Sequence, residues 1–65
     1  MKTVPAPGLG EYQICGEREE EAAAAFAEGY LAACRGSGDG DSMLWELAAL
    51  RRQVMEDYHV SVTLV

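Results

Sequence analysis

The chain has 65 residues, 49% of them hydrophobic, and 11 acidic residues against 5 Lys and Arg give a net charge of −6. This length suits one small domain, and a chain so short buries only about 60% of its unfolded surface, so the core needs support from a partner chain. The negative charge repels nucleic-acid phosphates and anionic lipid. We therefore expect no direct nucleic-acid binding and no membrane contact, and the charge favours a basic protein surface as partner.

The first residues contain Pro5, Pro7 and Gly8, which predict an irregular N-terminal arm over 1–8, with only a weak indication of a strand at 2–4. Residues 9–65 are predicted to form a single α+β domain. No secretion signal is visible, and the longest apolar run, 22–27, is too short to span a membrane. We therefore expect a cytoplasmic protein whose two cysteines are reduced thiols.

Residues 9–15 alternate in polarity, with Tyr12 and Ile14 on one side, which predicts a strand that Gly16 ends. A helix is predicted over 17–35, because glutamates crowd its first turns and Arg35 suits its last. Its apolar stripe consists of Ala22, Ala23, Phe26, Ala27, Tyr30, Ala33 and Cys34. Gly29 interrupts this helix and permits close approach of a neighbouring helix.

The segment 36–41 reads as a flexible acidic connection, and Ser42 or Asp41 is placed to cap a second helix over 43–58. Residues 59–65 alternate again and predict a second strand. The fold class is therefore α+β: a small β-α-α-β unit in which a helix hairpin backs two antiparallel strands. Such a sheet has open edges, so we expect a homodimer that extends it through an edge formed by Val60, Val62 and Leu64.

Residues suited to catalysis or metal binding do not form a recognisable set. Cys15, Cys34 and His59 lack the paired spacing of a zinc site, and nothing orients them for nucleophilic catalysis. Asp39 and Asp41 fit a calcium loop, but Met43 occupies its next ligand position. We expect no enzyme activity, no metal and no cofactor.

Protein binding is the function that the residues favour. Trp45 falls on the polar side of the second helix near Ala49, Arg52 and Glu56, as an interface anchor does, although the N-terminal arm or a dimer mate could equally cover it. Three acidic residues form a second candidate surface for a basic partner: Glu17, Glu21 and Glu28. The final Thr63-Leu64-Val65 also matches the short pattern of a PDZ-type ligand.

In size, acidity and α+β build, the chain resembles small phage- or mobile-element-encoded inhibitors of host machinery, anti-CRISPR proteins among them. The run from Gly16 to Ala22 is similar to the strand-to-helix junction of HicB-like antitoxins, although the following helix hairpin departs from their pattern. The leading expectation is a small acidic inhibitor or adaptor, which the first resemblance suits and which the thin core and open sheet edges predict to act as a dimer. The alternatives are a structural self-assembling subunit and a HicB-like antitoxin-type regulator.

Overall fold

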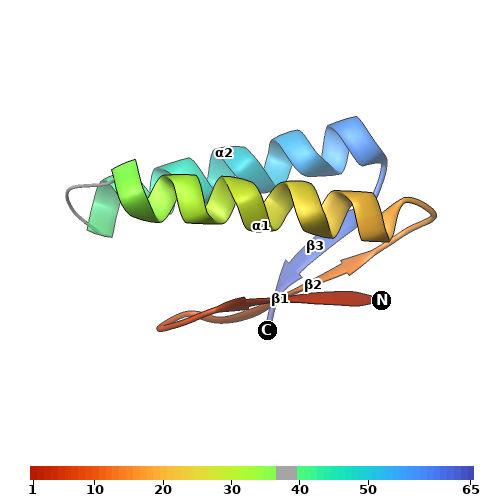
Figure 1. Cartoon of the computed structure of the whole chain (residues 1–65), viewed down its shortest axis with the longest axis horizontal. Helices are drawn as coiled ribbons and strands as arrows, with labels where there is room; N and C mark the ends of the chain where they lie inside the picture. Colours follow the sequence, from red (N-terminus) through yellow and green to blue (C-terminus); the bar gives the residue numbers. More distant parts are fainter. Residues whose placement is uncertain (37–39) are drawn as a thin grey trace.

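A computed structural model describes residues 1–36 and 40–65. The chain runs through strands β1 (Lys2–Ala6) and β2 (Gly10–Cys15), helices α1 (Glu19–Gly36) and α2 (Gly40–Tyr58), and strand β3 (Ser61–Leu64). The strands form one antiparallel sheet in the order β1-β2-β3, and both helices lie on the same face of it (Figure 1). The prediction of an α+β class is confirmed.

The predicted order of strand, helix, helix, strand is incomplete, because the structure has an additional strand, β1, before the strand that was predicted first. Residues expected in the irregular arm instead form β1, which pairs with β2 in a register that places Val4 opposite Tyr12. Pro5 did not prevent this, because a proline is tolerated on an edge strand where its missing N–H faces away from the sheet. Val4 and Ala6 are buried under α1, so β1 belongs to the core.

A tight turn joins β1 to β2, and its residues explain why the hairpin forms. The Leu9 N–H donates to the Ala6 carbonyl at 2.9 Å. Between them, Pro7 and Gly8 occupy the positions where a type II turn prefers proline and requires a positive φ, and Gly8 has a φ of 88°. The Pro-Gly pair is the sequence signal that identifies this hairpin.

Helix α1 begins at Glu19 rather than at residue 17, because the preceding residues form a turn in which the Glu19 N–H donates to the Gly16 carbonyl. Glu17 therefore lies before the helix. Most of the predicted apolar stripe is correctly placed: Ala22, Phe26, Tyr30 and Ala33 are buried. Cys34 is exposed, contrary to the prediction, because Ala33 takes the inward position in the last turns of α1 and the next residue is turned about 100° away from it.

Helix α2 begins at Gly40, earlier than predicted, so Asp41 lies in its first turn. Residues 37–39, which include the calcium-loop candidate Asp39, lie outside the described residues. Helix α2 ends at Tyr58, because His59 adopts a left-handed conformation with a φ of 53°. His59 therefore forms a turn, and β3 starts at Ser61 instead of residue 59.

The core lies between the helices and the inner face of the sheet. Phe26 and Ile14 are its largest fully buried side chains, and the rings of Phe26 and Tyr12 lie 4.7 Å apart, centroid to centroid. The opposite face of the sheet is left open and carries exposed or half-buried residues: Thr3, Pro5, Glu11, Gln13, Cys15, Ser61 and Thr63. Because most of these side chains are polar, that face tolerates water.

Candidate protein-binding surface

Helix α2 and strand β3 border a groove of about 520 Å³ at the side of the sheet opposite β1. Three large apolar side chains at this side remain exposed: Leu44 by 54%, Trp45 by 79% and Leu64 by 44%. Arg52 and Glu56 line both the groove and a smaller hollow around Trp45. We call this the α2–β3 surface and define it by Leu44, Trp45, Ala48, Arg51, Arg52, Met55, Glu56 and Leu64.

The helical period explains why this surface is left uncovered. Leu47 and Val54 point into the core and are buried. Around the axis of α2, Leu44 and Met55 are rotated to one side of the direction in which Leu47 and Val54 point. Their side chains are therefore directed toward the edge of the sheet. Since β3 is the last strand on that side, no further strand lies beneath them. The apolar face of α2 is therefore wider than the sheet that it covers.

Trp45 lies where the helical pattern predicted, beside Ala49, Arg52 and Glu56. The N-terminal residues do not cover it, because they form β1 at the far edge of the sheet. This finding removes the N-terminal arm from the three predicted explanations for a non-core tryptophan. An external protein and a dimer mate remain as candidate occupants of the site.

The backbone of β3 presents unpaired groups along its outer edge. Glu11 and Val65 exchange hydrogen bonds, the Val65 N–H donating at 2.8 Å and the Glu11 N–H at 3.3 Å. In an antiparallel pair such residues alternate with residues that point their N–H and C=O groups away. By this alternation Val62 and Leu64 direct these groups outward. Val60, the third predicted edge residue, lies outside β3.

The other edge of the sheet differs because of a proline. The same alternation turns the backbone groups of Val4 toward β2 and those of Thr3 and Pro5 outward. Pro5 has no N–H, so the outer edge of β1 lacks a donor in its centre. Proline at this position is a known protection against strand addition. Of the two edges, β3 is the one equipped to pair.

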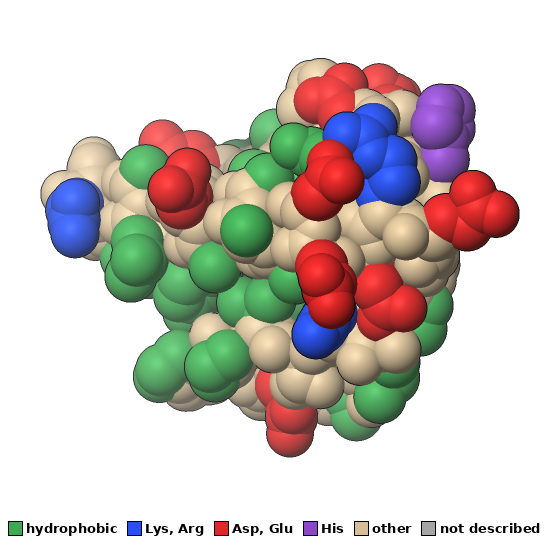
Figure 2. Space-filling view, turned by 45° about the vertical axis from the view of Figure 1, so that its right-hand side comes forward, with side chains coloured by type: hydrophobic (Ala, Val, Ile, Leu, Met, Phe, Trp, Pro, Cys, Tyr) green, Lys and Arg blue, Asp and Glu red, His purple; other side chains and the backbone are tan. Residues whose placement is uncertain are grey.

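The acidic residues that the sequence grouped into one surface are less available than expected. Glu21 accepts a hydrogen bond from Arg18 at 2.6 Å, and the Arg18 guanidinium also lies 4.7 Å from the centre of the Tyr58 ring. Glu17 lies in the turn before α1, whereas Glu28 lies two helical turns beyond Glu21. Charges of both signs therefore meet where α1 begins and α2 ends (Figure 2).

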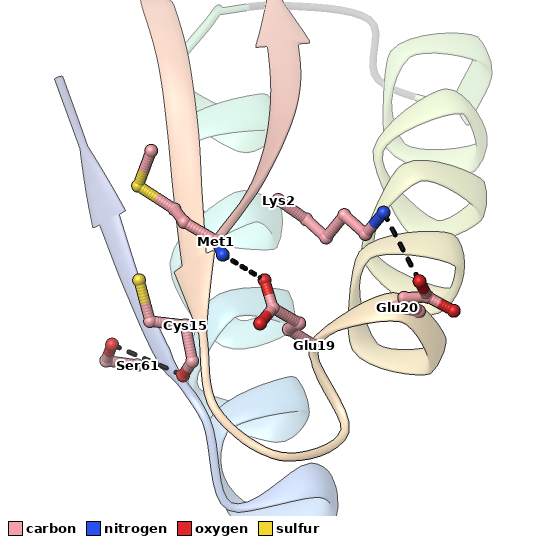
Figure 3. A network of polar contacts seen from close by, with 6 residues as sticks. All are labelled: Met1, Lys2, Cys15, Glu19, Glu20 and Ser61. Atoms are coloured by element: carbon pink, nitrogen blue, oxygen red, sulfur yellow. Dashed lines mark hydrogen bonds and ion pairs between the residues drawn. The ribbon is translucent and has the colours of Figure 1, made fainter.

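Two further ion pairs tie β1 to the first turn of α1 (Figure 3). The Met1 amino group lies 2.5 Å from Glu19, and the Lys2 ammonium lies 3.4 Å from Glu20. The hydrogen bond to Glu19 raises the pKa of the Met1 amino group above its ordinary value. Both contacts partly neutralise the acidic start of α1, so its negative field is weaker than the sequence suggests.

The candidate groups for chemistry remain apart. Cys15 and Cys34 are exposed free thiols on different elements, and His59 is exposed in the turn before β3. No group of three His, Cys, Asp or Glu side chains suited to a metal occurs among the described residues. Burial raises the pKa of the Tyr30 hydroxyl, and the neighbouring Cys34 thiol adds to that rise.

A second apolar groove, also of about 520 Å³, lies between β1 and the far end of α1. Its lining includes Pro5, Pro7, Leu31 and Met43, and Leu31 is 53% exposed. Sequence reasoning missed this groove, because one of its walls is the strand that was expected to be an irregular arm. It lacks an edge able to pair with another strand.

Neither helix in the described part of the chain carries an apolar stretch sufficient to cross a membrane. Comparison with protein-family models, with curated proteins and with solved structures finds no match for this chain. The arrangement of its own residues is thus the basis for a functional proposal.

Proposed function

We propose that this chain is a small protein-binding module, an inhibitor or adaptor with no catalytic role, and that the α2–β3 surface is where it binds protein. The supporting observation is the exposure of Trp45, at 79%, beside the partly exposed Leu44 and Leu64. Tryptophan contributes more binding energy than most residues when a partner buries it, and arginine is enriched at such sites. Arg52 lies next to Trp45 in the same hollow.

The outer edge of β3 adds a second means of attachment to the same surface. A strand that pairs with this edge gains main-chain hydrogen bonds from Val62 and Leu64, and its side chains reach the groove under α2. Apolar anchors supply affinity, while the strand edge fixes the orientation of the partner. Single exposed apolar residues are common on any protein. Their combination here with an open strand edge supports the interpretation that this is a specific binding surface.

The chain works as a homodimer under this proposal, and its external partner has a basic surface. The net charge of −6 supports such a partner through long-range attraction. Glu28 and Glu17 are the acidic residues of the predicted set for which the described structure gives no ion pair, so both are available to a basic partner. Glu21 contributes less, because Arg18 holds it.

Self-assembly into larger structures is the competing function, and the β1 edge argues against it. Open-ended growth by strand pairing requires two active edges on each copy, whereas Pro5 removes a donor from the β1 edge. Pairing through β3 alone closes on itself after two copies. The HicB-like alternative has no such geometric support and remains a prediction.

The test compares two variants that each shorten an exposed apolar side chain on a different surface. Trp45→Ala and Leu31→Ala are immobilised beside the unaltered chain, and proteins captured from the source cell are quantified by mass spectrometry. We expect Trp45→Ala to lose partners at least about tenfold while Leu31→Ala retains them, with both variants folded by circular dichroism. Equal capture by both variants, or unfolding of Trp45→Ala, contradicts the proposal.

A further inference from the structure

We infer that the occupant of the α2–β3 surface is a second copy of this chain, paired antiparallel through β3 about a two-fold axis that passes between the two Thr63 residues. This inference rests on the proposed function, because it names the partner of the same surface. It joins two three-stranded sheets into one continuous sheet with all helices on one face.

The register follows from which backbone groups are unpaired. Within β3 (Ser61–Leu64), the residues with outward N–H and C=O groups are Val62 and Leu64. An antiparallel mate satisfies both residues only if Val62 of one copy faces Leu64 of the other. That pairing places Thr63 opposite Thr63 of the second copy. A register centred on Val62 would require Val60, which lies outside the strand next to the left-handed His59.

A second copy fits this edge better than it fits β1, for two reasons. A two-fold axis brings identical edges together, and the β3 edge has a donor and an acceptor at each outward residue. The β1 edge lacks the donor at Pro5. Pairing of two such short strands buries only a small area, whereas a stable interface buries about 800 Å² per partner. The flanking α2 helix must therefore contribute, and it does so with Leu44, Trp45 and Met55.

Charge does not oppose this contact locally, although each copy is acidic overall. The charged residues of the α2–β3 surface are Arg51, Arg52 and Glu56, so both signs are present. The acidic start of α1 is held by contacts with β1 at the far edge of the sheet, away from the proposed axis. Two copies therefore meet through a side that carries charges of both signs.

The test uses engineered thiols in a chain whose own exposed cysteines are replaced, Cys15→Ser and Cys34→Ser. Thr63→Cys places the two new thiols opposite each other in a non-hydrogen-bonded pair, where Cβ atoms lie about 4.5 Å apart, close to disulfide geometry. Oxidised glutathione accepts the two electrons as the disulfide forms. Val65→Cys is the matched control on the same face of β3, because the two-fold register separates its thiols by about 13 Å.

We expect Thr63→Cys to form covalent dimers at least about tenfold faster than Val65→Cys. For the unaltered chain at about 100 µM, we expect sedimentation equilibrium to give twice the monomer mass of 7.0 kDa. Equal cross-linking of the two variants overturns the register, and a monomer at this concentration overturns the inference. If the chain is monomeric while Trp45→Ala still loses captured proteins, the proposed function stands and another protein occupies the surface. If the dimer forms and capture is unchanged by Trp45→Ala, external partners bind elsewhere on the chain, and the assignment of their binding to the α2–β3 surface fails instead.

Discussion

Gly29 in α1 faces Leu50 in α2 so closely that a Cβ atom built on the glycine would lie 2.5 Å from Cδ1 of the leucine. The Leu50 side chain therefore packs against the bare backbone of α1 at position 29, and a methyl group there would have to displace it. The packing of the two helices holds α2 in place over β3, so the shape of the α2–β3 surface depends on a contact on the other side of α2.

Gly29→Ala tests this contact. Alanine raises helix propensity by about 1 kcal/mol, but forcing a methyl group into a filled contact costs about 1–3 kcal/mol, so we expect a net loss of stability. In a Leu50→Ala background the obstacle is gone, and the same change should stabilise the chain by about 1 kcal/mol. Urea unfolding of the four proteins measures the coupling. An equal effect in both backgrounds would mean that the helices do not meet at this point.

Phe26 is fully buried, and its ring lies 4.7 Å from that of Tyr12, so its removal would leave a large cavity in the core. Phe26→Ala should remove about 3–5 kcal/mol, comparable with the whole stability of a domain of this size. We therefore expect that variant to be largely unfolded at 25 °C by circular dichroism. Leu31→Ala on the same helix is the control and should change stability by less than about 1 kcal/mol, because Leu31 is 53% exposed. Similar losses in the two variants would contradict this placement of the core.

The sequence predicted both helices, the strand before them and the strand after them, because their periodic patterns are strong and local. It gave only a weak indication of β1, at residues 2–4, although the Pro7-Gly8 pair that turns β1 into β2 was visible. Proline at position 5 reads as a strand breaker until the pairing partner is known, since its cost depends on which way the missing N–H points. That direction is a property of the assembled sheet.

The candidate site was predicted in part. The place of Trp45 beside Arg52 followed from helical spacing alone. Its exposure could not be predicted, because it depends on how far the sheet extends under α2 and on what the N-terminal residues do. The pairing of Arg18 with Glu21 has a local signal, a spacing of three residues, but the stacking of Arg18 on Tyr58 joins segments far apart in sequence. The negative charge available on the acidic surface was overestimated, because these contacts of Arg18 were not part of the prediction.

The hydroxyl of Tyr30 should titrate above its ordinary range, because burial raises its pKa. The unfolded chain releases this proton near pH 10, whereas the folded chain retains it. The folded state therefore keeps its full stability below about pH 10 and loses some as pH rises above that value. A difference titration at 295 nm between the unaltered chain and Tyr30→Phe measures this group. A transition at or below the ordinary value would show that Tyr30 is accessible to water.

Salt should act in opposite directions on the two kinds of binding. Each copy carries a net charge of −6, so long-range repulsion weakens self-association at low ionic strength. Raising the salt concentration from 10 mM to 100 mM shortens the screening distance from about 30 Å to about 10 Å, and the dimer should tighten several-fold. Binding of a basic partner should weaken over the same range. Sedimentation measures the first effect and surface plasmon resonance the second. A dimer that weakens as salt is added would indicate attraction between unlike surfaces, contrary to pairing through β3.

Pro5→Val should convert the protected edge of the sheet into an active one. Valine supplies the missing N–H at the centre of the β1 edge and has a high strand propensity, so the hairpin itself should remain intact. Each copy would then have two pairing edges, and we expect growth beyond the dimer, seen by light scattering at rising concentration. Thr3→Val is the matched control, because it adds the same side chain to the same face of β1 while the backbone donors stay unchanged. If both variants aggregate alike, exposed apolar area is the cause and the donor at position 5 is irrelevant. If neither grows, Pro5 is not what limits assembly to two copies.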